Sequence, residues 1–122
     1  MVNDLILKMD EPDELLFKID VYGTMQKPHL VRLVCEIDNN KFYAFNGELV
    51  SGGIKIIVPV INDNLIVPQE NYEGKLEIFI ENYYFVPLKF NIVFTKKFSV
   101  SAGRINKNSK ITISAAELNK NQ

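Results

Sequence analysis

The sequence predicts an all-β fold: an immunoglobulin-like antiparallel β-sandwich of about seven strands with a C-terminal extension. Three observations carry this prediction. Apolar residues alternate with polar ones in successive short runs, these runs are rich in Ile, Val, Phe and Tyr, and turn-forming residues separate them. Short strands with regular turns between them are typical of a sandwich or a small barrel. The chain has 122 residues, which is enough for one domain with its own core.

The expected strands follow from a period of two, which sends alternate side chains to opposite faces of a sheet. In the first run, for example, Phe17, Ile19 and Val21 share one face. The predicted strands lie at residues 17–21, 31–37, 42–45, 48–50, 54–60, 76–80, 83–86 and 90–94.

Turn residues lie between these runs, because Asn, Asp and Gly adopt the backbone conformations that close tight turns. We expect turns at residues 38–41, Asn46-Gly47, 51–53 and Glu81-Asn82. Proline has no N–H to donate to a sheet, so Pro59 and Pro87, inside apolar runs, should mark an edge strand, a break or a bulge.

Charge divides the chain into an acidic body and a basic tail. Residues 1–95 contain 8 Lys and Arg against 14 Asp and Glu, a net charge of −6. Residues 96–122 contain 6 Lys and Arg against Glu117 alone, a net charge of +5. Together with the strand pattern, this predicts three segments: an acidic N-terminal lead-in at 1–14, a β-sandwich domain at 15–98 and a basic C-terminal arm at 99–122.

The basic arm has too few apolar residues to pack a core of its own. It should therefore either add to the domain's own sheet or lie on a partner, and we favour the partner. The acidic cluster at residues 10–14 is either a solvated approach to the first strand or a contact for a basic surface, such as the arm of a neighbouring copy.

Cysteine usage and hydropathy limit the class of protein. Cys35 is the single cysteine, so no internal disulfide is expected, and alternation places it on the apolar face of its run. No segment has 18 consecutive apolar residues, and the first residues lack the pattern of a signal peptide. We therefore expect that the protein is made in the cytoplasm of the cell that translates the chain and that it does not contact a membrane.

The sequence contains no pattern that predicts catalysis or a cofactor. His29 is the single histidine, no Gly-x-Ser-x-Gly elbow occurs, and no phosphate-binding glycine loop or Cys-x-x-Cys pair is present. We expect no enzyme, no metal site, no cofactor and no small-molecule substrate. Nucleic acid is not the expected partner either, because the acidic body would repel a duplex despite the basic tail.

The candidate partner-binding residues are cations of the tail and aromatics of one hairpin. Inward-facing Leu76, Ile78 and Ile80 would put Phe79 on the outside, and exposed aromatics are favoured at the centres of interfaces. The alternative is that a second sheet or the arm covers these aromatics. The candidates are Lys96, Lys97, Arg104, Lys107, Lys110, Phe79, Tyr83 and Tyr84.

Three stretches resemble small β-sandwich domains in structural and head-assembly proteins of tailed bacteriophages. The stretches are 31–37 (VRLVCEI), 53–60 (GIKIIVPV) and 75–88 (KLEIFIENYYFVPL). They share a strand ending in a charged turn, a Gly-led strand ending in proline and an aromatic strand ending in Val-Pro-Leu. No functional residues transfer with this resemblance.

The resemblance implies a virion structural protein that decorates or cements a phage capsid through protein–protein contacts. The implied partners are the major capsid protein, neighbouring copies of this chain, or both, and the implied location is the phage head. Two alternatives remain open at this point. One is an internal scaffold or assembly protein of the head, and the other is a carbohydrate- or receptor-binding module.

Overall fold

The structure is a computed structural model that describes residues 2–62, 64–105 and 110–118, with the backbone alone described at 98, 99 and 110–118. These residues form nine strands and no helix, so no helix that could span a bilayer occurs among them. The strands are β1 (Val2–Lys8), β2 (Asp13–Lys18), β3 (Leu30–Asp38), β4 (Lys41–Val50), β5 (Gly53–Val58), β6 (Asn71–Ile80), β7 (Tyr83–Thr95), β8 (Phe98–Ile105) and β9 (Lys110–Leu118). The predicted all-β class is confirmed.

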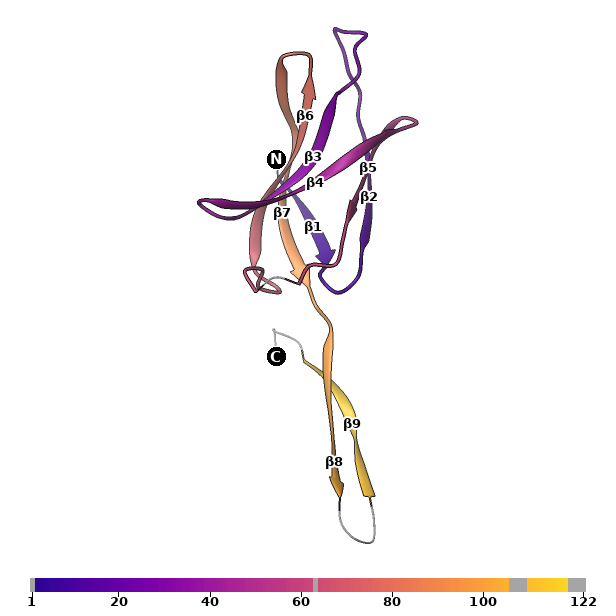
Figure 1. Ribbon diagram of the computed structural model, residues 1–122, viewed down its shortest axis with the longest axis vertical. Helices are drawn as coiled ribbons and strands as arrows, with labels where there is room; N and C mark the ends of the chain where they lie inside the picture. The colour runs from indigo at the N-terminus through magenta and orange to yellow at the C-terminus, as the bar shows by residue number, and fades with distance from the viewer. Residues whose placement is uncertain (1, 63, 106–109, 119–122) are drawn as a thin grey trace.

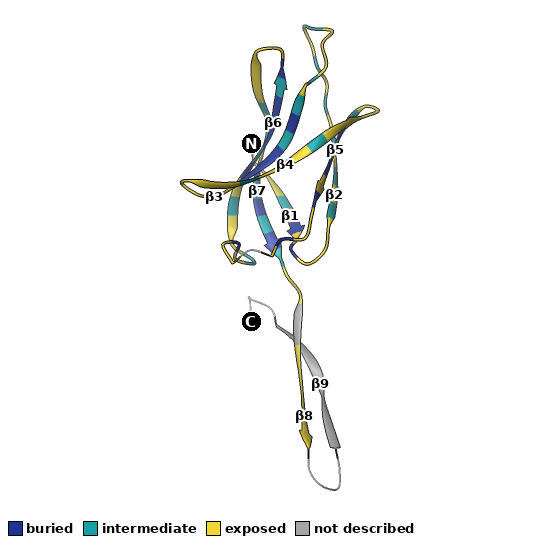
Figure 2. Ribbon diagram, viewed as in Figure 1, coloured by how far each residue is buried: buried dark blue, intermediate teal, exposed yellow. Residues whose placement is uncertain are grey.

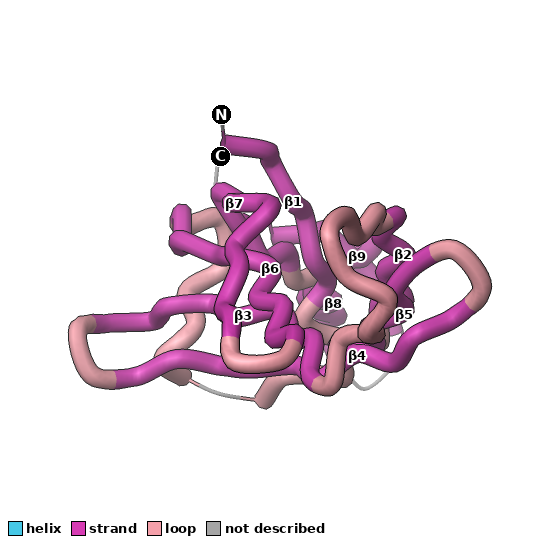
Figure 3. Tube along the Cα trace, turned by 90° about the horizontal axis from the view of Figure 1, so that it is seen from above, coloured by secondary structure: helices cyan, strands magenta, loops and turns pink. Residues whose placement is uncertain are grey.

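Seven of the strands form one sheet that curls into a nearly closed barrel (Figures 1 and 3). The strand order is β1-β7-β6-β3-β4-β5-β2, and every neighbouring pair is antiparallel except β1 and β7, which are parallel. The finer prediction of an immunoglobulin-like antiparallel sandwich is not confirmed, because the sheet has two features that the sequence did not predict. The strands belong to one continuous sheet, and one pair within it is parallel.

Strand β4 makes the sheet continuous, because its two halves pair with different neighbours. Residues 41–46 pair with β3, and residues 47–50 pair with β5. At the change of partner, Gly47 faces the core, where a Cβ atom would lie 2.8 Å from Cγ2 of Ile54 and 2.8 Å from Cγ1 of Ile56. The absence of a side chain at Gly47 thus lets β4 pass close over two buried isoleucines. Asn46-Gly47, predicted as a turn, is instead the middle of a strand.

The N-terminal segment also differs from its prediction. Residues 1–14 were expected to precede the sheet, but Val2–Lys8 form β1, and Val2 to Lys8 pair in register with Lys89 to Thr95 of β7. Leu7 of this strand is fully buried in the core. Alternation in this segment is weak in the sequence, because the exposed β1 face carries Val2 and Ile6 rather than polar residues alone.

Strand β7 contains Pro87 and joins two runs that were predicted as separate strands, 83–86 and 90–94. The register between β6 and β7 shifts between Leu76 and Ile78, so two β7 residues, Val86 and Pro87, lie opposite Glu77 alone. Proline at such a bulge interrupts no regular ladder bond, which agrees with the expectation for Pro87. Pro59, the other proline in an apolar run, directly follows the end of β5.

The core fills the interior of the barrel, and its side chains come from alternate positions of every strand of the sheet except β2, which contributes partly buried residues (Figure 2). The fully buried side chains at the centre are Leu7, Leu33, Cys35, Ile54, Ile56, Val58, Leu76, Ile92 and Phe94. Phe17 of β2 packs against this cluster, with its ring 5.7 Å from that of Phe90. All described buried apolar residues lie between Leu7 and Phe94, so the barrel has a complete core without the C-terminal residues.

Strands β8 and β9 form a separate two-stranded antiparallel hairpin that projects away from the barrel (Figure 1). Arg104 and its β8 neighbours from Val100 to Ile105 are exposed, and Val100 and Ile105 retain 65% and 82% of their accessible surface. The hairpin therefore buries these side chains neither in a core of its own nor against the barrel. Of the two options for the arm, addition to the domain's own sheet is not what the structure shows.

Substitution of Gly47 by alanine should destabilise the barrel by about 2 kcal/mol, since the new methyl group overpacks two fully buried isoleucines. The free energy of unfolding from urea denaturation measures this change, and Asn46→Ala, on the exposed side of the same strand, is the matched control. Equal stabilities of the Gly47→Ala and Asn46→Ala proteins would show that β4 does not pass as close to the core as described.

Candidate functional site

The cations predicted to bind a partner lie on the hairpin and on the connection that leads to it. Lys96 and Lys97 are exposed between β7 and β8, and Arg104 is exposed on β8. Lys110 begins β9, where the structure describes the backbone alone, and Lys107 lies outside the described residues. The described cations of the tail thus lie outside the barrel.

The acidic cluster at residues 10–14 makes its described contacts within the chain. Asp10 accepts a hydrogen bond from the Lys97 backbone N–H at 3.3 Å, and Asp13 accepts one from the Lys8 N–H at 2.6 Å. Glu11 forms an ion pair of 2.7 Å with Lys8, which raises the pKa of Lys8 through the hydrogen bond and charge of Glu11. The cluster therefore helps to fix the end of β7, where the chain leaves the barrel.

The predicted aromatic residues do not form one patch, because alternation sends them to two faces. Phe79 and Tyr84 are a cross-strand pair on the outer face, the side of the sheet that points away from the core, with their rings 5.0 Å apart. Tyr83 pairs with inward-facing Ile80 and lies 6.2 Å from the ring of Phe85. Tyr83 is 64% exposed and Tyr84 is 48% exposed, so both rings are accessible from solvent.

A charged cluster of Arg32, Lys75, Glu77 and Tyr84 occupies the centre of the outer face. Glu77 is only 5% exposed, although alternation predicts a position on the solvent side. Its carboxylate accepts hydrogen bonds from Arg32 Nε at 2.6 Å and from the Tyr84 hydroxyl, and Lys75 Nζ lies 3.6 Å away. Arg32 also lies over the Phe79 ring at 5.6 Å, a cation–π distance. Neighbouring side chains therefore cover the carboxylate.

The pKa shifts within the cluster favour an ionised Glu77 carboxylate and a protonated, neutral Tyr84 hydroxyl. Burial by itself raises the pKa of Glu77, but the hydrogen bonds from Tyr84 and Arg32 and the charges of Arg32 and Lys75 lower it overall. The hydrogen bond to Glu77 raises the pKa of Tyr84. A carboxylate with its pKa lowered and already bound by Arg32 and Tyr84 is poorly suited to act as a general base, so we interpret the cluster as a structural element of the sheet.

An apolar groove opens where the barrel fails to close, between residues 18–22 and residues 85–88. It has a volume of about 380 Å³, and the buried side chains of Leu76, Ile78 and Ile80 contribute to its lining. Phe85 also lines it and is 48% exposed. The sequence could not reveal this groove, because its walls belong to segments that come together only when the sheet curls.

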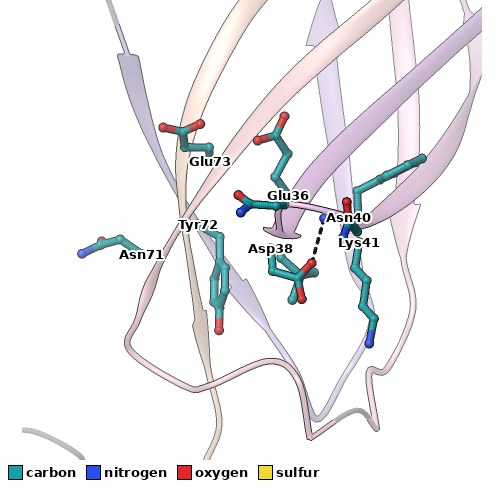
Figure 4. Close-up of a pocket in the computed structure, with 10 residues that line it drawn as sticks. Glu36, Asp38, Asn40, Lys41, Asn71, Tyr72 and Glu73 are labelled. Atoms are coloured by element: carbon teal, nitrogen blue, oxygen red, sulfur yellow. Dashed lines mark hydrogen bonds between the residues drawn. The ribbon is translucent and has the colours of Figure 1, made fainter.

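A polar groove of about 550 Å³ lies at the opposite end of β6, beside the β3–β4 turn (Figure 4). Glu36 and Glu73 are directly opposed across β3 and β6, and Figure 4 shows their carboxylates pointing the same way. Asp38 accepts a hydrogen bond of 2.9 Å from the Asn40 N–H, which closes the turn. Phe42, also in the lining, is 58% exposed.

The remaining candidate chemical groups are Cys35, in the core, and His29, which is exposed beside Phe79. Cys35 is fully buried, and burial, assisted by the charge of Glu36, raises the pKa of its thiol to about 12. His29 donates its backbone N–H to Phe79 at 3.0 Å, and its ring lies 6.3 Å from the Phe79 ring. Within residues 2–62, 64–105 and 110–118, no three His, Cys, Asp or Glu side chains come together as metal ligands.

Comparison with family models and curated proteins assigns no family to this chain. No protein-family model matches the chain, and no curated protein matches it.

Replacement of Glu77 by glutamine should lower the free energy of unfolding by about 2 kcal/mol at neutral pH, because the charged hydrogen bonds to Arg32 and Tyr84 are lost. A folded pKa that is lowered adds stability above the unfolded value of about 4.3. That stability disappears as pH falls through the folded pKa. The free energies of unfolding of the unchanged protein and of the Glu77→Gln protein should therefore converge below about pH 4.

Urea denaturation at a series of pH values measures this difference. Glu48→Gln removes an exposed carboxylate that also faces a lysine, Lys55, at 3.9 Å, and it should change stability little at any pH. A Glu77→Gln difference that stays constant from neutral pH to pH 2 would contradict the assigned direction of the pKa.

Proposed function

We propose that this protein is a structural binding protein in which the barrel is a rigid body and the β8–β9 hairpin is an arm that attaches to another protein. The single observation behind this proposal is the projecting hairpin, whose described side chains are exposed although Val100 and Ile105 are apolar. Ordered backbone that leaves apolar side chains in water gains stability when a partner covers them. The net charge of +5 for residues 96–122 favours an acidic surface as that partner.

We place the protein in the phage head, as a capsid decoration or cement protein. This step rests on the resemblance of residues 31–37, 53–60 and 75–88 to small head-assembly domains of tailed phages. In this proposal the partner is the major capsid protein, neighbouring copies of the chain, or both. A capsid offers many identical sites, so weak contacts by each arm add up when copies are linked to one another.

The pairing order supports the immunoglobulin-like part of the proposal. In that fold, strands C, F and G are neighbours in one sheet, and strands B and E belong to the other. Strands β3, β6 and β7 are neighbours in this order, and β2 pairs with β5. We interpret the barrel as an immunoglobulin-like sandwich whose two sheets are joined through β4.

Removal of the arm tests the attachment. A chain of residues 1–97 retains every described buried apolar residue, so it should unfold cooperatively and remain as stable as the full-length protein. It should nevertheless bind virions of the encoding phage at least about tenfold more weakly, as measured by co-sedimentation, because the contacts of the hairpin are lost. Equal binding by the two proteins would contradict the proposal that the hairpin attaches the protein to its partner. A gene that lies outside any phage genome would contradict the proposed place in the phage head.

An internal scaffold is the main alternative within the same class, and it has a different fate. A decoration protein remains in mature virions, whereas a scaffold is present before DNA packaging and is then lost. Mass spectrometry of purified mature virions separates the two. Recovery of the chain in stoichiometric amounts supports decoration, and its restriction to precursor heads supports the scaffold.

A carbohydrate-binding module is the second candidate function, and the polar groove favours it. Sugar recognition needs an exposed aromatic ring beside polar groups in a concave site. Phe42 is exposed and lines the groove together with Asp38, Asn40 and Lys41. Binding on a glycan array that Phe42→Ala abolishes would support this function, and an array without binding would remove it.

A further inference from the structure

The apolar groove coincides with an unpaired stretch of sheet edge. Strand β1 pairs with β7 only from Lys89 to Thr95, so no described strand pairs with the outer edge of residues 83–88. On the opposite wall, β2 ends at Lys18, and residues 19–22 continue without strand pairing. The barrel is therefore open along a seam between residues 83–88 and residues 19–22.

The seam exposes side chains that would normally be covered. Phe85 on one wall is 48% exposed and Tyr22 on the other is 87% exposed, and both line the groove. Ile19, Val21 and Leu88, also in the lining, are partly buried hydrophobic residues that pack on the core. An apolar segment entering the groove would thus extend the existing core rather than create a new one.

The same chain carries a segment, the β8–β9 hairpin, whose apolar side chains and positive charge suit the apolar groove of an acidic body. The hairpin presents Val100 and Ile105 to solvent, and it belongs to a tail of net charge +5. The barrel belongs to a body of net charge −6, so the tail of one copy is attracted to the body of another. The hairpin points away from its own barrel, so its exposed residues are free to meet a second molecule (Figure 1).

We propose that the β8–β9 hairpin of one copy docks in the apolar groove of a second copy. The hairpin contributes apolar side chains such as Val100, and the groove contributes Phe85 and the floor formed by Ile78. Pro87 has no N–H and limits the added backbone pairing, so packing of side chains supplies most of the contact. The inference deepens the proposed function, since it shares the premise that the hairpin binds another protein, and it names the receiving site.

This contact joins two different surfaces and therefore leaves one hairpin and one groove free in every pair. Such head-to-tail contacts continue into rings or open chains unless something caps them. On a capsid, chains of this kind would link neighbouring copies and so reinforce the lattice. In solution, association should increase with protein concentration and weaken as salt screens the opposite charges.

Two single variants and their mixture test the contact by sedimentation velocity. Phe85→Arg places a cation in the groove and should weaken self-association at least about tenfold. Val100→Asp places an acid on the hairpin and should do the same. Each change is at an exposed position, so the barrel should stay folded. The mixture should form a dimer that goes no further, because the Phe85→Arg copy supplies an intact hairpin and the Val100→Asp copy an intact groove.

Phe42→Arg and Leu16→Asp make the same chemical changes at exposed positions outside the groove and the hairpin, and both should associate like the unchanged protein. A full-length protein that stays monomeric at high concentration and low salt would overturn the inference, as would a mixture that fails to dimerise although each variant is folded. If residues 98–122 are then still required for binding to virions, the proposed function stands and only the receiving site is wrong.

Discussion

The close passage of β4 over the core is the constraint on which the rest of the structure depends. The strand leaves β3 and joins β5 at Gly47, where Ile54 and Ile56 occupy the space that a side chain would need. This passage turns two groups of strands into one curled sheet, so the core is enclosed from several sides. The sheet ends at β1 and β2, and the apolar groove is the part of the seam that these strands leave open.

The charged cluster connects neighbouring strands of the same sheet. Glu77 links β6 to Arg32 of β3 and to Tyr84 of β7, so its side chain connects three adjacent strands on their outer face. It lies opposite the bulge that contains Pro87, where the regular ladder of β7 is interrupted. Removal of one partner from such a covered ion pair leaves a charge without compensation, which disfavours any other register of these strands.

The barrel and the hairpin differ in how much of their own apolar surface they bury. The barrel buries a complete set of side chains between Leu7 and Phe94. The hairpin has a backbone ladder with a register shift between Val100 and Ala102, and it leaves its described apolar side chains exposed. A two-stranded hairpin with nothing packed on it is marginal in water, so its stability depends on what it contacts. This difference is the physical basis of the proposed division into a rigid body and an arm.

Alternation by itself determined the all-β class, the buried position of Cys35 and the outward position of Phe79, because these depend on neighbours two residues apart. Charge and composition, rather than alternation, set residues 96–122 apart from the acidic body. Only the tertiary structure decided that Asn46-Gly47 lies within a strand, that Val2–Lys8 complete the sheet and that Glu77 is covered. Each of these depends on residues far apart in the chain, such as Arg32 and Glu77, which are 45 positions apart. The curl of the sheet brings such residues together, and the curl cannot be predicted from the local periodicity of the sequence.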